Sequence, residues 1–264
     1  MKILPEEIEI YRDKKWRRDE SLLIDKAVQV EELIEELGFL LTLTDSRTNF
    51  PSVYIGVCGR RDVHTPKNVQ KDYETSLAWT LKDEVMMRGK VFYGKLCKGR
   101  AMFVAPRLIK YFHAIYGDEY ISSDAEKVLK ILRKEWEMAT SDLREETKIA
   151  DRKSLTKAIE ELQRKMYVVP SEVLYKPKFT YIWTLAEARF PEEMSEKVDR
   201  ETALREIARQ FLKINGQTML GDLAKFTGLK RKECGKANHE LVDEGFAERL
   251  ETGVYRLKSL NVKE

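Results

Sequence analysis

SDLREETKI at residues 141–149 and GDLAKFTGL at residues 221–229 are two versions of one pattern, and this repetition decides the fold. A second pair follows in the same order, because AIEELQRKMYV at 158–168 matches ANHELVDEGFA at 237–247 with Ala, Glu, Leu and an aromatic residue in register. The offsets are 80 residues (221 minus 141) and 79 residues (237 minus 158). Two ordered matches at a nearly constant offset indicate a duplicated structural unit.

The first copy has the pattern of three helices followed by a hairpin. Apolar periodicity predicts a helix from Ala125 onward, and two more helices are expected at 141–148 and 151–165. Residues 166–185 then alternate apolar and polar side chains around a turn that contains Pro and Lys, as a hairpin does. Three helices followed by a hairpin are the plan of a winged helix.

The second copy repeats this plan. Helices are expected at 200–214, 220–227 and 230–244. A hairpin at 246–257 closes the unit. The expected fold class is therefore α+β and mostly helical, built from tandem winged-helix (helix-turn-helix) units with β-hairpin wings.

The N-terminal half is more divergent. A helical pattern stops at Gly38 and continues as a strand-like stretch, and residues 60–76 are polar enough for a surface loop. A helix at 81–88 then precedes a hairpin that turns near Gly99. One interpretation of this half is a degenerate winged helix. The expected domains are the divergent N-terminal domain at 1–120, a winged-helix unit at 121–190 and a C-terminal winged-helix unit at 198–260.

Charge is abundant but balanced in this chain. Its 264 residues include 48 Lys and Arg against 45 Asp and Glu, which leaves a net charge of +3 while 35% of all residues are charged. A basic surface must therefore arise by segregation of charges rather than from an overall excess. Such an ion-rich composition is also typical of proteins that work at high temperature.

Cysteines and histidines are scattered. Three cysteines, at 58, 97 and 234, and three histidines lie too far apart for the ligand spacing of a metal site, so neither a metal nor a cofactor is expected. The first residues are too charged for a signal peptide, and no apolar run is long enough to span a membrane. We therefore expect a cytoplasmic protein with reduced thiols, in which Cys58 and Cys97 act as small buried apolar residues.

A central block carries a family resemblance. WTLKDEVMMRGKVFYGKLCKGRAMFV at 79–104, then RLIKYFHAIYG at 107–117 and the two repeated units, resemble the winged-helix proteins related to the AlkZ-like DNA glycosylase family. The resemblance runs from about residue 30 to residue 257. It implies a tandem winged-helix core that grips double-stranded DNA, and a role in DNA repair.

The glycosylases of that family cut the bond between a damaged base and its sugar, and they carry a Gln-x-Gln or Gln-x-Asp motif after an early helix. In register with GFLLTLTDS, this motif falls on Leu41, Thr42 and Leu43. Leucine can neither position water nor stabilise a cationic sugar, so the catalytic residues do not carry over. Thr44, Asp45 and Ser46 are the nearest polar residues. Whether the chain is an enzyme stays open at this point; if it is one, a DNA glycosylase is expected.

Basic residues gather at the starts of the two third helices, DRKSLTK at 151–157 and LKRKECGK at 229–236. Positive side chains at a helix N-terminus are locally unfavourable unless an anion lies nearby, and DNA phosphate would supply one. The alternative is a set of solvated charges on an ionic surface. The candidate DNA contacts are Arg152, Lys153, Lys157, Lys230, Arg231, Lys232 and Lys236 on the helices, with Lys176 and Lys178 at the tip of the first wing.

A second group offers chemistry. A glycosylase that uses an amine nucleophile needs a lysine near a carboxylate, and Lys82 lies beside Asp83 in the sequence. Tyr93 or Trp79 would stack on an extruded base. Neighbouring helix residues diverge by about 100 degrees, so Lys82 and Asp83 need not share a face. An ordinary surface ion pair with Glu84 or Arg88 is the competing and favoured interpretation. The catalytic candidates are Lys82, Asp83, Asp45 and Tyr93.

These features predict a duplex DNA-binding protein of the repair type. One alternative is a transcriptional regulator, which would use the same helices and would dimerise to read a palindrome. Another is a non-enzymatic assembly module with a protein partner, because winged helices also bind proteins and the net charge is near zero.

Overall fold

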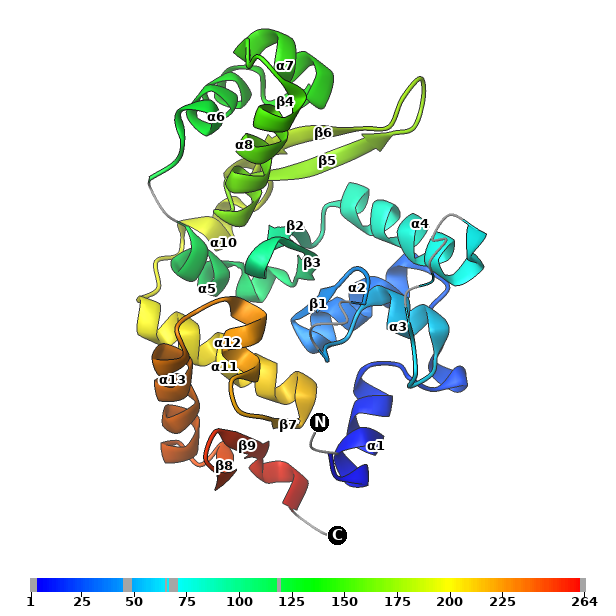
Figure 1. The fold of residues 1–264 in the computed structure, drawn as a ribbon, viewed down its shortest axis with the longest axis vertical. Helices are drawn as coiled ribbons and strands as arrows, with labels where there is room; N and C mark the ends of the chain where they lie inside the picture. The colour runs from blue at the N-terminus through cyan, green and yellow to red at the C-terminus, as the bar shows by residue number, and fades with distance from the viewer. Residues whose placement is uncertain (1–3, 45–48, 65, 67–70, 118–119, 262–264) are drawn as a thin grey trace.

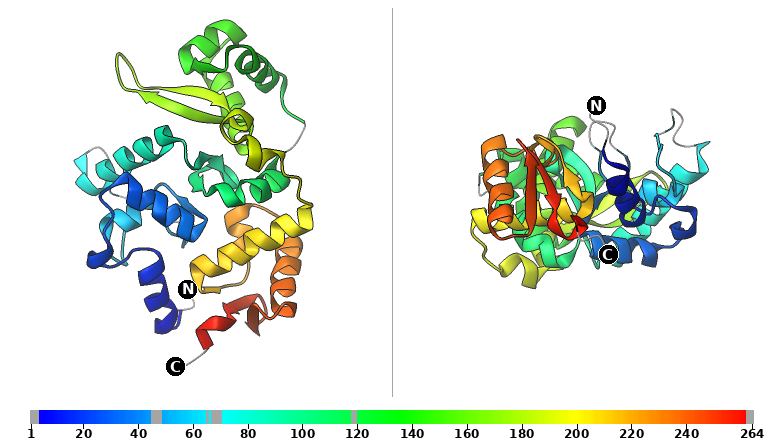
Figure 2. Two further views of the ribbon diagram at one scale, coloured as in Figure 1. Left: turned by 180° about the vertical axis from the view of Figure 1, so that it is seen from behind. Right: turned by 90° about the horizontal axis from the view of Figure 1, so that it is seen from below.

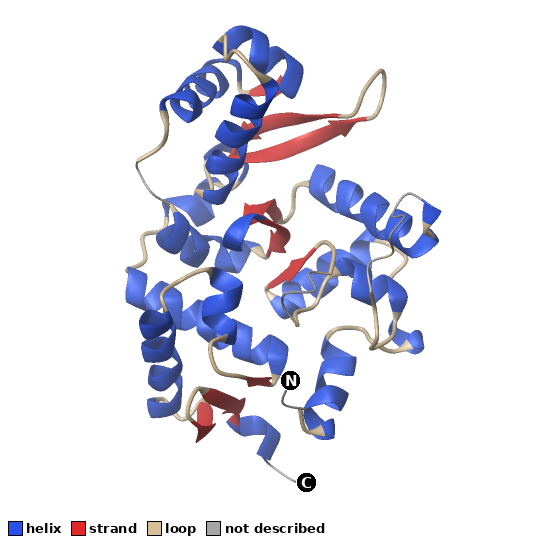
Figure 3. Cartoon of the chain, in the orientation of Figure 1, coloured by secondary structure: helices blue, strands red, loops and turns tan. Residues whose placement is uncertain are grey.

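The computed structural model describes residues 4–44, 49–64, 66, 71–117 and 120–261, so Asp45 and Ser46 lie outside the described residues. Helices dominate, and the strands form small antiparallel sheets (Figure 3). The α+β, mostly helical fold class is therefore confirmed. No helix among the described residues is long and apolar enough to cross a membrane.

The N-terminal half contains one complete unit. It has the order helix, strand, two helices and a hairpin, formed by α2 (Ala27–Leu37), β1 (Phe39–Leu41), α3 (Val53–Cys58), α4 (Tyr73–Arg88), β2 (Phe92–Leu96) and β3 (Arg100–Val104). The strands pair antiparallel in the order β1-β3-β2. Helix α1 (Glu6–Lys15) precedes this unit, and α5 (Pro106–Tyr116) follows it.

The same order recurs twice. The second unit consists of α6 (Ser123–Glu135), β4 (Glu137–Ala139), α7 (Thr140–Thr147), α8 (Arg152–Arg164), β5 (Val168–Leu174) and β6 (Thr180–Leu185). The third consists of α11 (Arg200–Asn215), β7 (Gln217–Thr218), α12 (Asp222–Thr227), α13 (Arg231–Asp243), β8 (Ala247–Glu251) and β9 (Val254–Leu257). Their strand orders, β4-β6-β5 and β7-β9-β8, repeat that of the first unit. Two short helices, α9 (Ala186–Arg189) and α10 (Pro191–Ser195), link the second unit to the third.

The predicted helices and hairpins of the C-terminal half are confirmed to within two residues. In the N-terminal half the prediction for 60–76 was wrong at its end, because α4 begins at Tyr73. The Asp72 carboxylate accepts a hydrogen bond from the Thr75 backbone N–H at 2.7 Å and caps the helix. The first turn of α4 is polar enough to resemble a loop, and the cap makes it helical.

Gly38 ends α2 as predicted. Its φ of +79° lies in the left-handed region, and a Cβ there would meet Leu108 at 2.5 Å and Gln210 at 2.9 Å. The chain therefore turns from α2 into β1 at a point where α5 and α11 approach the backbone closely.

The three units differ in their positions in the molecule (Figures 1 and 2). The second unit forms one end of the molecule, and its long β5–β6 hairpin reaches over α4 of the first unit. The first and third units lie side by side, with both chain termini at the end opposite the second unit.

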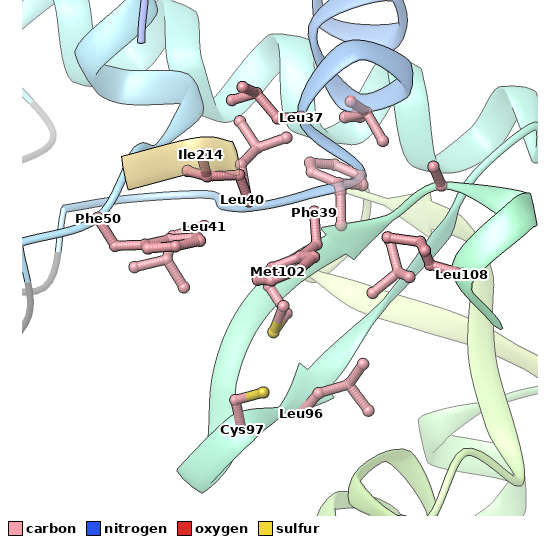
Figure 4. Close-up of a cluster of buried hydrophobic side chains, with 14 of the residues drawn as sticks. Leu37, Phe39, Leu40, Leu41, Phe50, Leu96, Cys97, Met102, Leu108 and Ile214 are labelled. Carbon is pink, nitrogen blue, oxygen red and sulfur yellow. The ribbon is translucent and has the colours of Figure 1, made fainter. Parts of the chain in front are cut away.

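A shared aromatic core joins the first and third units. Phe50 of the first unit stacks on Phe211 with ring centroids 5.3 Å apart, and its ring lies 4.2 Å from that of Phe226. Phe39 lies 5.5 Å from Phe50 and 5.7 Å from Phe226. Figure 4 shows Phe39 and Phe50 among buried side chains of both units, including Ile214. The two units therefore bury one continuous core.

Helix α1 and the residue that follows it hydrogen-bond to the end of α11. Arg12 donates from Nε to the Asn215 carbonyl at 2.9 Å, and the Trp16 indole N–H donates to the Ile214 carbonyl at 2.8 Å. These are among the last carbonyls of α11, which have no partner inside their own helix. Arg12 is only 3% exposed, and its burial lowers the pKa of the guanidinium to about 10.

The second unit has its own core, a buried cluster that begins at Ile121 and ends at Leu185. It attaches to the rest through α8 and the β5–β6 hairpin. The Gln163 side-chain oxygen accepts from the Lys95 backbone N–H at 3.2 Å, and Lys95 pairs with Glu160 at 2.5 Å. Polar contacts therefore help to join α8 to the first unit.

Removing the aromatic ring that joins two units should destabilise both. We expect Phe226→Ala to lower the free energy of unfolding by about 3–5 kcal/mol, because it leaves a cavity in the shared core. Phe179→Ala is the control, because that ring is 49% exposed and should cost far less. Urea unfolding measures both variants, and equal losses would contradict the shared core.

The three cysteines are buried and free of disulfides. Burial raises the pKa of the Cys58 and Cys97 thiols to about 12, and also raises the pKa of Cys234. At pH 8 a thiol with that pKa is ionised to only about one part in ten thousand. We therefore expect a disulfide thiol reagent to modify the folded protein far more slowly than the urea-unfolded protein, as followed by absorbance. Rapid reaction of the folded protein would contradict this burial.

Candidate functional site: a buried lysine between two units

The third helix of the third unit begins with a run of cations. Lys230, Arg231 and Lys232 are exposed, and none of them forms an ion pair within the described residues. The Lys230 backbone N–H donates to the Glu233 carboxylate at 3.3 Å, so one carboxylate partly offsets the charge at this helix start. Lys236, further along the same helix, pairs with Glu201 at 2.7 Å.

The third helix of the second unit has a similar start. Asp151 caps α8 by accepting from the Ser154 backbone N–H at 2.9 Å, and hydrogen bonds from Ser154 lower the pKa of Asp151. Arg152, Lys153 and Lys157 are exposed, and none has an ion pair in the part of the chain that the structure describes. The opposite face is in the core as predicted, with Leu155, Ile159 and Leu162 buried.

The β5–β6 hairpin of the second unit, called the wing from here on, carries both charge and aromatic rings. Lys176 and Lys178 are exposed at its tip, and neither forms an ion pair with any described residue. Tyr175 and Phe179 flank them with ring centroids 5.6 Å apart, and the aromatic row continues through Tyr181. The row points from the wing tip toward the base of the hairpin.

Lys82 lies in the interior, at the junction of α4 and this wing. Its side chain is 0% exposed, its Nζ lies 2.5 Å from Asp83 Oδ1, and it donates to the Tyr181 hydroxyl at 2.9 Å. The favoured surface pair with Glu84 or Arg88 was therefore wrong. Arg88 pairs instead with Glu31 at 2.8 Å. Both Lys82 and Asp83 are buried because α4 is covered on two sides, by its own unit and by β5.

Aromatic faces surround the ammonium group. Lys82 Nζ lies 4.3 Å from the ring centroid of Trp79, 5.4 Å from that of Tyr181 and 5.8 Å from that of Tyr93. Ring faces carry negative charge density and stabilise a cation that has been removed from water. Together with the Asp83 carboxylate, they form a site for a positive charge that Lys82 itself occupies.

The wing also closes over the carboxylate. The Tyr175 hydroxyl donates to Asp83 Oδ2, and burial followed by this hydrogen bond raises the pKa of Tyr175 to about 12. Burial raises the pKa of Tyr93 well above its ordinary value, with a further contribution from Tyr181. The pair is thus held in a dry environment, and both hydroxyl groups that reach it from outside α4 belong to the second unit.

Comparisons with known proteins identify the family of this chain and a solved structure with a similar fold. Residues 24–228 match the model of a family described as AlkZ related. The chain belongs to this family. Among solved structures, the DNA glycosylase AlkZ of Streptomyces sahachiroi is similar with a TM-score of 0.63, at 9% identity over 100% of this chain and 73% of that chain. A search of the curated proteins finds no match. The two proteins therefore share a fold although their sequences have diverged.

The AlkZ-type motif register lies next to the buried lysine. Leu41 and Thr42 are 1% and 2% exposed, and Leu41 packs in the shared core (Figure 4). The Thr42 hydroxyl lies near Tyr93 and lowers its pKa, against the larger effect of burial. No carboxamide or carboxylate occupies these three positions. The charges of the lysine site come instead from α4, and the hydroxyl groups that hydrogen-bond to them come from the wing.

A pocket of about 470 Å³ lies elsewhere, between α2, α5 and α11. Most of its cations are paired: Arg107 lies 2.8 Å from Glu35, and Arg209 lies 3.1 Å from Glu206. Lys213 forms no ion pair with a described residue, but it is exposed, and the described lining residues include no buried nucleophile. The lysine site is therefore the stronger candidate for chemistry.

The structure brings together three of the four catalytic candidates, Lys82, Asp83 and Tyr93, and Asp45 lies outside the described residues. Sequence reasoning missed Tyr175 and Tyr181, which supply the hydrogen bonds from the wing. Their signal was present in YKPKFTYIW at 175–183, where aromatic rings alternate along a hairpin. What they would contact was not readable from the chain.

Breaking the buried pair from one side should be costly. We expect Lys82→Met to lower the free energy of unfolding by about 3–5 kcal/mol, because Asp83 is left as an uncompensated buried charge. The double variant Lys82→Met with Asp83→Asn should recover much of this stability. As a control, Lys134→Met removes one partner of an exposed pair with Glu135 and should change stability by less than about 1 kcal/mol. Urea unfolding of all three tests the pair, and additive losses in the double variant would contradict it.

Proposed function

We propose that this protein binds double-stranded DNA in a repair setting, and that its three repeated units are winged helices with the domain limits 1–120, 121–190 and 198–260. In this proposal α8 and α13 approach the DNA with their basic N-terminal turns, and the second unit's wing contacts an adjacent phosphate or the minor groove. The AlkZ-related family and the likeness to a DNA glycosylase support the repair setting.

The observation that carries this proposal is the start of α13. Much of the surface consists of matched ion pairs, such as Arg205 and Arg209 with Glu244 on the same unit. Lys230, Arg231 and Lys232 instead point their charges into solvent at the positive end of a helix. These unpaired charges do not stabilise the free protein. They would stabilise a complex in which a phosphate lies at the start of the helix.

The test is duplex affinity across a salt series for the wild type and for the triple variant Lys230→Glu, Arg231→Glu and Lys232→Glu. We expect the logarithm of the wild-type affinity to fall steeply with the logarithm of salt. The variant slope should be shallower by about 0.9 for each phosphate that its side chains no longer neutralise.

A matched control makes the same change in charge on another helix. Lys127→Glu, Lys130→Glu and Arg133→Glu alter three exposed cations of α6, which the proposal does not place on DNA. This control should keep most of the wild-type slope. If both triple variants lose the same DNA affinity and salt dependence, the effect comes from overall charge, and α13 is not part of the DNA interface.

The other functions give different results. A dimer that prefers one palindromic sequence would favour a transcriptional regulator. No binding at low salt would leave a protein-binding assembly module. Release of alkylated bases, detected as alkali-labile sites, would add glycosylase activity to DNA binding.

A further inference from the structure

We propose that Lys82 is the amine nucleophile of a lyase that acts on abasic sites in DNA, with the aldehyde form of the deoxyribose as substrate. The DNA-binding part of this inference rests on the proposed function, and the chemistry rests on the geometry of the lysine site. The ligand class is an aldehyde sugar flanked by phosphates.

Burial sets Lys82 apart. Among the described lysines it is the one that is fully buried, with a side-chain exposure of 0%. A lysine ammonium group normally lies at the surface in contact with water. A buried ion pair adds little to stability compared with apolar residues of the same volume, so stability alone does not account for it. Removal from water is also a recognised way to prepare a lysine for nucleophilic attack. Because Asp83 and the rings hold Lys82 as an ammonium at rest, the attack requires transfer of a proton to Asp83.

Asp83 supplies the base that such an attack requires. Its Oδ1 lies 2.5 Å from Lys82 Nζ, and the contact is direct. No hydrogen bond from the described residues reaches this oxygen, so its contact with Lys82 is an ion pair, and the ammonium must turn an N–H toward Oδ1 for the proton to pass. Tyr181 remains within hydrogen-bonding distance of Nζ at 2.9 Å and can hold the nitrogen in place as the charge moves.

Access runs past side chains that already meet solvent. Trp79 is 38% exposed and Tyr175 is 55% exposed, and these two cover Lys82 and Asp83 from outside. The exposed Lys176 and Lys178 lie immediately beyond Tyr175, where the phosphates of a bound sugar would be. Withdrawal of the Tyr175 ring would therefore open the pair toward a basic surface.

The chemistry balances without an oxidant or a reductant. One ammonium proton passes to Asp83, and the neutral Nζ attacks C1′ of the aldehyde to form a carbinolamine. Loss of the C1′ hydroxyl as water gives an imine between Lys82 and the sugar. Asp83, which has returned its proton to the departing C1′ hydroxyl, then takes the C2′ proton. The electron pair forms the C2′–C3′ double bond, the C3′–O3′ bond breaks, and the strand on the 3′ side leaves with its phosphate. Water hydrolyses the imine and regenerates the amine.

Borohydride trapping tests this step. The wild-type protein is incubated with a duplex that holds one abasic site, with and without sodium borohydride, and the covalent complex is read as a shifted band in a denaturing gel. We expect a trapped complex for the wild type, and its loss for Lys82→Arg, which keeps the positive charge but cannot form the imine. Lys95→Arg is the matched control, because Lys95 also has a carboxylate partner, and it should trap normally.

Mass spectrometry of the trapped wild-type complex guards against a variant that misfolds, because the reduced adduct should map to the peptide that contains Lys82. A native gel without borohydride measures binding separately. Binding without trapping overturns the lyase and leaves the proposed function standing, whereas no binding to any duplex overturns both. An adduct on another lysine, or undiminished trapping by folded Lys82→Arg, also overturns the inference.

Discussion

The contact of Phe50 with Phe211 and Phe226 is the interaction on which the rest of the structure depends. A unit of three short helices and a hairpin buries only a small apolar core alone. The first and third units resolve this by sharing one core across a sequence separation of well over a hundred residues. Helix α1 then covers the last carbonyls of α11 and ties the two units further.

This pairing leaves the second unit in a different position. It keeps a core of its own and touches the other units mainly through α8 and its wing. The wing therefore lies over α4 instead of projecting freely, and the hydroxyls of Tyr175 and Tyr181 complete the surroundings of Lys82 and Asp83. A charge pair buried at a junction between units is affected by any movement between them, because its solvation changes when the junction opens.

Charge segregation shows how a nearly neutral chain can present a basic surface. Arg205 and Arg209 lie against carboxylates on neighbouring helices, where opposite charges balance. The first turns of α8 and α13 break this pattern, although the net charge is only +3. Local excess at helix starts, where the backbone itself is positive, makes an anion-binding surface that the composition does not reveal.

The sequence by itself determined the local structure: the repeat at 141–149 and 221–229, the stop at Gly38 and the hairpins all follow from periodicity and turn residues, which act over a few neighbours. Sequence patterns also indicated Lys82 and Asp83 as catalytic candidates. Only the tertiary structure decided that both are buried, because adjacent helix residues point in different directions and α4 had to be covered from two sides. The phenols that complete the site arrive from about ninety residues away, and no local pattern encodes such a contact.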